Sequence, residues 1–313
     1  MDFSPRNLYL PGGKIIVPGG GMGVDAGISP GPSGGASGPT PDMRYDPQWI
    51  VDNFGMSTAQ DGVDLNDSTN LFGSSVQGAW YSTGALAQHL EGYTSSGING
   101  VTTINHADAN IGNKPTLLFV STALLGTWCH PNRQAGHAVA TESLFHPATF
   151  TYFFVACRRS AGPTTTTMSL AGTRNTSGSQ GWFLNFRESG GTRTVALNWA
   201  NGSGTARGML GKVWSTTSDT WFILAIQHDG TNIKLWCNEY FASPDGSVAE
   251  GYTPRSSTST DHLDTFQLGS DGQQGVLTNV RVADVLLFNS VLSEADFNAT
   301  CDDLSAKFGI AMN

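Results

Sequence analysis

Residues 221–241 read WFILAIQHDGTNIKLWCNEYF. Apolar and β-branched residues lie on both sides of the Asp-Gly-Thr-Asn segment at 229–232, so this stretch predicts two β-strands joined by a tight turn. Residues 280–289 have the composition of another strand, and they lead directly into an amphipathic pattern at 293–308. A strand-rich chain that closes with one short helix indicates an all-β sandwich.

The β pattern extends over the second half of the chain. Residues 150–157 are almost continuously apolar, as expected for a strand buried on both faces. Residues 181–187 alternate, with Trp182, Leu184 and Phe186 on one face, and residues 194–200 alternate in the same way. Further strands are expected at 114–120, 221–228, 232–238, 265–269 and 279–288. Residues 55–113 interleave short apolar segments with Gly, Asn, Asp and Ser, which predicts a loop-rich region.

The predicted C-terminal helix carries signals at both ends. Ser293 with Asp296 fits a capping box, and Gly309 is a natural residue to follow the last turn. Four residues form one apolar stripe and are expected to be buried: Phe297, Cys301, Leu304 and Phe308.

Composition and charge exclude several classes of protein. Charged residues make up 13% of the chain, about half of the usual share in soluble proteins, and the net charge is −9. Nucleic acids and anionic membranes bind basic surfaces, so neither is expected as a partner. The N-terminus lacks a signal-peptide pattern, and no apolar stretch is long enough to span a bilayer. The four cysteines have no paired spacing and are expected to be free thiols: Cys129, Cys157, Cys237 and Cys301.

Residues 1–42 differ from the rest, because they hold 7 of the 14 prolines and 11 of the 39 glycines. Two apolar patches interrupt this segment, and a solvated linker would not need them. The first patch is Leu8, Tyr9 and Leu10, and the second is Ile15, Ile16 and Val17. We expect an extended arm that binds other subunits through these six residues, followed by a sandwich domain over residues 43–313.

Several segments together resemble the concanavalin A-like, or laminin-G-like, jelly-roll domains. They are residues 113–119, 150–157, 221–238, 285–297 and 304–310, so the resemblance covers roughly residues 110–310. It implies a two-sheet antiparallel jelly-roll sandwich with a short C-terminal helix. Such domains are frequent in bacterial surface proteins and bacteriophage structural proteins. Their usual roles are carbohydrate or protein binding, and some relatives are glycosidases.

The sequence offers no catalytic residues. Jelly-roll glycosidases need paired carboxylates projecting from one strand, typically spaced as Glu-x-Asp-x-Glu, and this pattern is absent. Glu188, Glu239 and Glu250 are isolated from one another, and Asp261 and Asp264 lie in a Ser/Thr-rich stretch. We therefore expect the protein not to be an enzyme.

A calcium loop is the one candidate metal site. Asp61, Asp64, Asn66 and Asp67 place three carboxylates and an amide in one loop, although a solvated acidic loop explains the same residues. Cys129, His130 and His137 lack a second pair of ligands, so zinc is not expected. No other cofactor is indicated.

Aromatic residues leave two interpretations open. Trp182, Trp199, Trp214, Trp221 and Trp236 all fall in the predicted sandwich. They either fill the core or offer flat platforms on which sugar rings stack, and the difference depends on exposure.

Two functions fit these observations. The first is a non-enzymatic virion structural protein of the capsid decoration type, assembled in the host cytoplasm and anchored by its arm to other virion proteins and to copies of itself as an oligomer. The alternative is a carbohydrate-binding module of a phage tail or head fibre that contacts host glycans. A jelly-roll glycosidase ranks third.

Overall fold

The computed structural model describes residues 8–9, 15–16, 38–54, 63–64, 79–86, 89–94, 102–120, 127–131, 144–159, 167–174, 179–189, 192–201, 206–214, 219–249, 252–254, 266–270 and 279–313. The chain divides into two units, Met1–Ala36 and Ser37–Asn313. In the first unit, strand β1 (Leu8–Tyr9) pairs antiparallel with β2 (Ile15–Ile16). The two apolar patches of the predicted arm thus meet through their backbones. Leu10 and Val17 lie outside the described residues.

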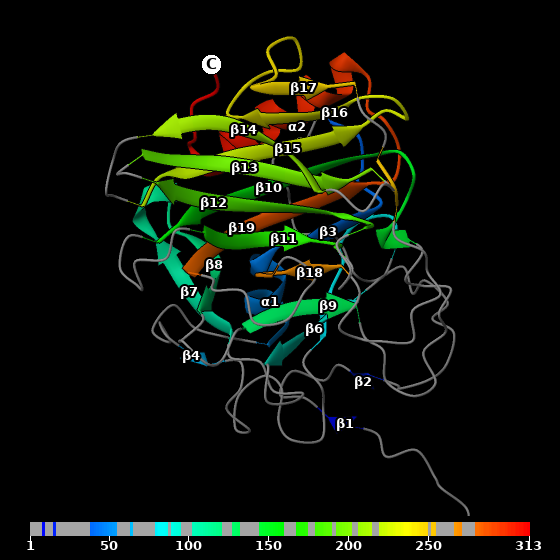
Figure 1. Cartoon of the computed structure of the whole chain (residues 1–313). Helices are drawn as coiled ribbons and strands as arrows, with labels where there is room; N and C mark the ends of the chain where they lie inside the picture. The colour runs from blue at the N-terminus through cyan, green and yellow to red at the C-terminus, as the bar shows by residue number, and fades with distance from the viewer. Residues whose placement is uncertain are drawn as a thin grey trace, which may run out of the picture. The chain divides into compact units, whose positions relative to one another are not determined.

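The second unit contains two antiparallel sheets (Figure 1). The first, called the β10 sheet, runs in the order β17 (Gly246–Val248), β16 (Ile233–Cys237), β15 (Trp221–His228), β10 (Phe150–Arg158), β19 (Asn279–Phe288), β8 (Lys114–Val120), β7 (Thr102–Asp108) and β4 (Val63–Asp64), and β3 (Met43–Tyr45) also pairs with β19.

The second, called the β12 sheet, runs in the order β14 (Ala206–Trp214), β13 (Thr192–Ala200), β12 (Trp182–Ser189), β11 (Thr167–Gly172), β18 (Gln267–Leu268), β9 (Thr127–Pro131), β6 (His89–Thr94) and β5 (Ala79–Tyr81). The two sheets pack face to face, which confirms the predicted all-β antiparallel sandwich with a C-terminal helix.

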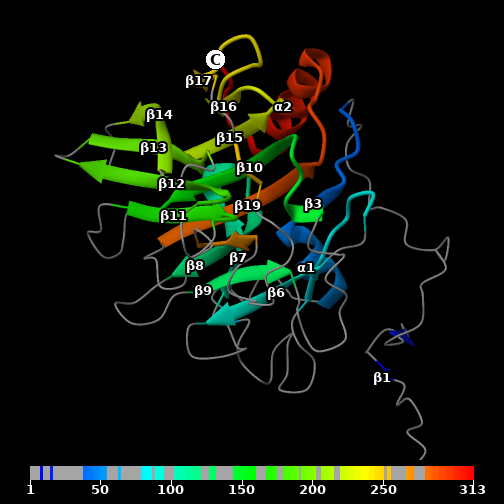
Figure 2. The ribbon, with the colours of Figure 1, turned by 45° about the vertical axis from the view of Figure 1, so that its right-hand side comes forward.

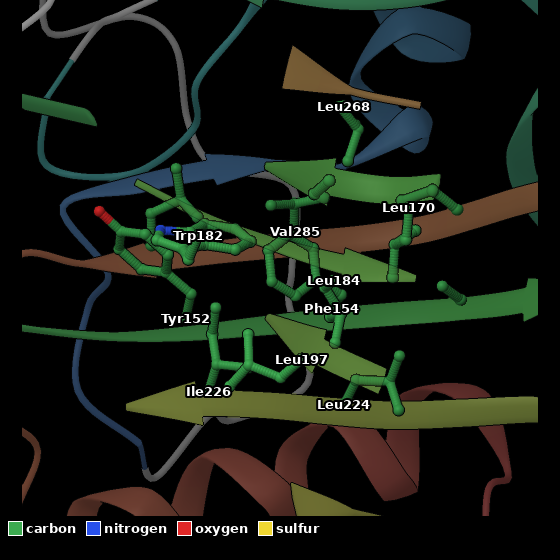
Figure 3. Packing of buried hydrophobic residues seen from close by; sticks show 14 of the residues in the cluster. Tyr152, Phe154, Leu170, Trp182, Leu184, Leu197, Leu224, Ile226, Leu268 and Val285 are labelled. Atoms are coloured by element: carbon green, nitrogen blue, oxygen red, sulfur yellow. The ribbon is translucent and has the colours of Figure 1, made fainter. Parts of the chain in front are cut away.

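Strand β10 is buried on both faces, as its sequence predicted. Tyr152 and Phe154 point into the sandwich, where they meet Trp182, Leu184 and Leu197 of the opposite sheet (Figure 3). The alternate residues of β10 point to the other side and pack under helix α2 (Glu294–Phe308); they are Phe153, Val155 and Cys157. The β10 sheet therefore separates two hydrophobic layers, one between the sheets and one beneath the helix.

Helix α2 has the predicted caps and the predicted buried stripe. The Ser293 hydroxyl accepts a hydrogen bond from the Asp296 backbone N–H at 3.2 Å, and Gly309 ends the helix at φ 66°. Phe297, Cys301, Leu304 and Phe308 are all buried. No helix in the described part of the chain is long and apolar enough to cross a membrane.

A buried ion-pair network connects α2 to two strands. Asp284 of β19 is completely buried, and its carboxylate accepts hydrogen bonds from Arg44 of β3 at 2.6 Å and from Lys307 of α2 at 2.8 Å. Lys307 also contacts Asp46 at 2.5 Å. The network, which we call the Asp284 clasp, joins the first strand of the sandwich unit to its last strand and to the C-terminal helix.

Some elements differ from expectation. Helix α1 (Pro47–Phe54) and the short 3-10 helix η1 (Ala109–Ile111) were not predicted. Strands β6 and β7 lie in the loop-rich region, where strands with long loops were expected but none was placed. Within the unit Ser37–Asn313, the Gly38 N–H donates to Asp303 at 3.1 Å, and Asp42 accepts from the Asn289 N–H at 2.7 Å.

Candidate functional site

The predicted calcium residues fall mainly outside the described part of the chain. Asp61, Asn66 and Asp67 lie outside it, and only the backbone of Asp64 is placed, in β4 opposite Thr103. Among the described residues, no group of three or more His, Cys, Asp or Glu side chains could hold a metal ion. The calcium loop stays a prediction.

The isolated glutamates form ion pairs that hold strands together. Glu188 contacts Arg158, which comes from the opposite sheet, and Arg193 of β13. Hydrogen bonding to Arg158 lowers the pKa of Glu188. Glu239 pairs with Lys212 at 3.1 Å. Glu250, Asp261 and Asp264 lie outside the described residues.

The tryptophans and thiols belong to the core. Four tryptophans are buried: Trp182, Trp199, Trp221 and Trp236. Trp214 is half-buried against the same core. The core interpretation is therefore confirmed for the four buried tryptophans, and they offer no surface to a sugar ring. Cys157, Cys237 and Cys301 are buried free thiols, and the side chain of Cys129 lies outside the described residues.

The outer face of the β12 sheet is the best candidate site. Figure 1 views the sandwich from this side, with α2 behind the sheets. Strand alternation turns Leu184 and Phe186 into the core and the intervening residues outward. Antiparallel pairing then sets the outward residues side by side, and they include Ser169, Phe183, Asn185, Arg187, Thr194, Ala196, Asn198 and Gly208. We call this set the outer face.

Asn185 occupies the centre of the outer face. It lies opposite Ser169 on one side and Ala196 on the other. Its exposed fraction is only 2%, yet its side-chain oxygen has no hydrogen-bond partner among the described residues. A buried acceptor oxygen without a partner costs about 1–3 kcal/mol, so it marks a place where a ligand can supply the missing donor.

Small residues adjoin both amides of this face. Ala196 adjoins Asn185, and Gly208 adjoins Asn198. A Cβ at position 208 would lie 2.7 Å from the Asn198 side-chain oxygen, closer than two such atoms approach. Glycine at 208 is thus required for the position of the Asn198 amide.

An aromatic ring and two arginines complete the outer face. The Arg174 guanidinium lies 5.1 Å from the ring centre of Phe183, within range of a cation–π contact. Arg187 is exposed and forms no ion pair with the described residues. The face therefore combines hydrogen-bonding amides, one partly exposed aromatic ring and positive charge.

Comparison with known proteins gives structural likenesses only. No protein family matches the sequence. No curated protein matches it either. Among solved structures, CBM40 of the Ruminococcus gnavus IT-sialidase bound to α2,6-sialyllactose is 14% identical, covering 51% of this chain and 85% of that one at a TM-score of 0.39.

A second likeness is to a larger protein. The binding domain of botulinum neurotoxin DC, in complex with rat synaptotagmin II, is 12% identical at a TM-score of 0.45. It covers 79% of this chain, which spans only 52% of that one. These structures are binding domains by name. At such low similarity they assign no function to this chain.

Sequence reasoning did not find the outer face. Alternation in 181–187 put Trp182, Leu184 and Phe186 on one side, which places Phe183, Asn185 and Arg187 on the other. These three alternate residues were the only sign of the outer face that the sequence analysis contained. Its neighbours on β11 and β14 could not be found, because neither strand was predicted.

Proposed function

We propose that the chain is a non-catalytic carbohydrate-binding protein whose ligand lies on the outer face of the β12 sheet. The observation that carries this proposal is Asn185, whose buried side-chain oxygen has no hydrogen-bond partner among the described residues at the centre of the outer face. Sugar hydroxyls donate and accept hydrogen bonds, so one hydroxyl can supply the donor that Asn185 lacks.

The surroundings of Asn185 suit a sugar ring. Phe183 offers an apolar surface to the C–H groups of the ring, and Asn198 adds a second amide next to Gly208. Binding sites for small molecules commonly combine apolar contact with a few placed polar groups. The outer face has both components within one sheet.

The test is binding of the purified protein to a panel of immobilised oligosaccharides. Asn185→Ala should weaken binding about tenfold, because it removes a hydrogen bond formed in a largely buried position. The same change removes an unpaired, buried side-chain oxygen, so the free energy of unfolding should stay level or rise. Loss of affinity without loss of stability separates a binding role from a structural one.

The matched control is Gln48→Ala, which removes an exposed amide from α1, away from the outer face. It should leave sugar binding unchanged. Equal binding by wild type, Asn185→Ala and Gln48→Ala would refute the proposed site, and binding to no sugar of a broad panel would refute the function.

A second candidate role concerns the virion. The supporting observation is that Met1–Ala36 forms a unit of its own, in which the Leu8–Tyr9 and Ile15–Ile16 patches pair with each other. We propose that this unit anchors the protein to other virion proteins in an assembled particle. Deleting residues 2–36 should abolish incorporation into particles while sugar binding persists. Incorporation at the wild-type level would contradict the anchoring role.

A further inference from the structure

The charges on the outer face all have one sign. On the outward positions of β11 to β14 and the adjoining described residues, the charged side chains are Arg174 and Arg187. Glu188 points the other way and contacts Arg158 and Arg193. The whole chain carries a net charge of −9, so this face is positive on a negative protein.

Arg187 is the arginine available to a ligand. It is exposed, and no described acidic side chain pairs with it. A guanidinium presents its N–H groups as a planar fork that matches a carboxylate with two parallel hydrogen bonds. No acidic side chain in the described part of the β12 sheet pairs with the Arg187 guanidinium.

The neighbours of Arg187 extend the site along one strand. Arg187, Asn185 and Phe183 are alternate residues of β12, so they follow one another on the same face. At a strand rise of about 3.3 Å per residue, the row spans about 13 Å. The row thus offers a carboxylate partner at one end, an amide in the middle and an aromatic surface at the other end.

We infer that the ligand is an acidic glycan, with a sugar carboxylate paired to Arg187, a hydroxyl bonded to Asn185 and a ring against Phe183. This inference rests on the proposed sugar-binding function and adds the chemical class of the sugar. The arginine decides between acidic and neutral sugars, whereas Asn185 and Phe183 contribute to binding of either.

The experiment compares acidic oligosaccharides with related neutral ones. Oligogalacturonides and their methyl esters form one pair, and sialyllactose and lactose form another. The wild-type protein should bind the acidic member at least about fivefold more tightly in one or both pairs, as expected for a charge-assisted pair at a partly exposed site. That preference should shrink between 50 and 200 mM salt, where the screening length falls.

Substitutions at Arg187 test whether this side chain causes the preference for acidic sugars. Arg187→Gln should remove the preference and leave binding of the neutral member unchanged, whereas Arg187→Lys should retain part of it. Lys114→Gln is the matched control, because it removes the same charge from β8 in the opposite sheet. It should leave the preference intact.

Each outcome separates the two proposals. Equal binding of acidic and neutral members, with both reduced in Asn185→Ala, would overturn the acidic specificity and leave sugar binding standing. A loss in Lys114→Gln as large as in Arg187→Gln would also overturn it, because net charge would then explain the preference. Binding to no member of either pair or of the broad panel would refute both proposals.

Discussion

Asp284 shows how one residue can hold distant parts of the chain together. Its carboxylate is completely buried and faces Arg44 and Lys307. Burying a charge is unfavourable unless the opposite charges remain in place, so each partner depends on the others. Removing the carboxylate alone leaves two cations facing each other in a poorly hydrated position.

Asp284→Ala should therefore lower the free energy of unfolding by about 3–5 kcal/mol, as breaking a buried ion pair does. Urea denaturation followed by tryptophan fluorescence measures this difference. Glu294→Ala, an exposed carboxylate in the first turn of α2, is the control and should change stability by less than about 1 kcal/mol. A similar effect of the two substitutions would show that the clasp does not stabilise the fold.

The clasp also predicts a pH dependence. Burial alone would raise the pKa of Asp284, but the charges of Arg44 and Lys307 outweigh it and hold the pKa below its usual value. A carboxyl with a lowered folded-state pKa stabilises the fold above its unfolded pKa of about 3.9, and this stabilisation is lost as pH falls through the folded-state pKa. The stability difference between wild type and Asp284→Asn should therefore be constant from pH 7 to pH 5 and shrink only below about pH 4. A difference that vanished already between pH 7 and pH 5 would contradict this assignment.

The buried thiols make a chemical prediction at the same scale. Burial raises the pKa of Cys301 to about 12 and also raises the pKa of Cys157 and Cys237. The thiolate is the reactive form, so these three residues should resist iodoacetamide at pH 8 in the native protein. Peptide mass spectrometry should find them labelled only after unfolding. Rapid native labelling of any of the three would contradict their burial.

At the scale of elements, Phe297 is one of the buried side chains that hold α2 to the β10 sheet. Phe297 is fully buried, and its ring centre lies 4.7 Å from that of Trp236 and 4.9 Å from that of Phe153. Phe297→Ala should lower the free energy of unfolding by about 3–5 kcal/mol, because it leaves a cavity beneath the helix. Ser293→Ala removes only the N-cap and should cost about 1 kcal/mol. Denaturant unfolding of both variants should show this order, and the reverse order would contradict the assigned packing.

The sequence predicted the elements whose signals are local. Strands β8, β10, β15 and β19 and helix α2 occupy the predicted segments, because long apolar runs and capping residues need no knowledge of distant neighbours. Strand β14 was missed, since Gly208 and Gly211 weaken its β pattern. Tertiary packing requires the second glycine, because a Cβ at 211 would lie 2.8 Å from a Leu235 methyl group and 2.9 Å from the Cys237 sulfur.

The candidate site was harder to predict than the fold. The outer face depends on the register that sets Asn185 between Ser169 and Ala196, and register across strands is a property of the folded sheet. The exposure of each side chain to solvent is also a property of the folded sheet. The sequence left the tryptophans open as sugar platforms, whereas the sandwich buries four of them and turns Phe183 outward.

At the scale of the whole molecule, two truncations should behave differently. Deleting residues 2–36 removes only the first unit, so the midpoint of thermal unfolding of the sandwich should stay within a few degrees of wild type. Deleting residues 2–46 also removes β3, and with it Arg44 and Asp46 of the Asp284 clasp. That longer deletion should lower the midpoint by ten degrees or more, on the order expected for the loss of several kcal/mol. Calorimetry distinguishes the two, and equal midpoints would show that β3 is dispensable.

The hydrogen bond between Gly38 and Asp303 places the start of the described sandwich on one side of the two sheets. It fixes the first described residue of the sandwich beside α2, and Figure 2 shows α2 on the far side of the β10 sheet from the β12 sheet. Gly38 therefore lies on the α2 side of the β10 sheet, whereas the outer face with Asn185 and Arg187 lies on the opposite side of the sandwich. Many sandwiches held to one surface by their α2 side would present their outer faces in the same direction, so that weak individual contacts could add up on a target bearing many sugars.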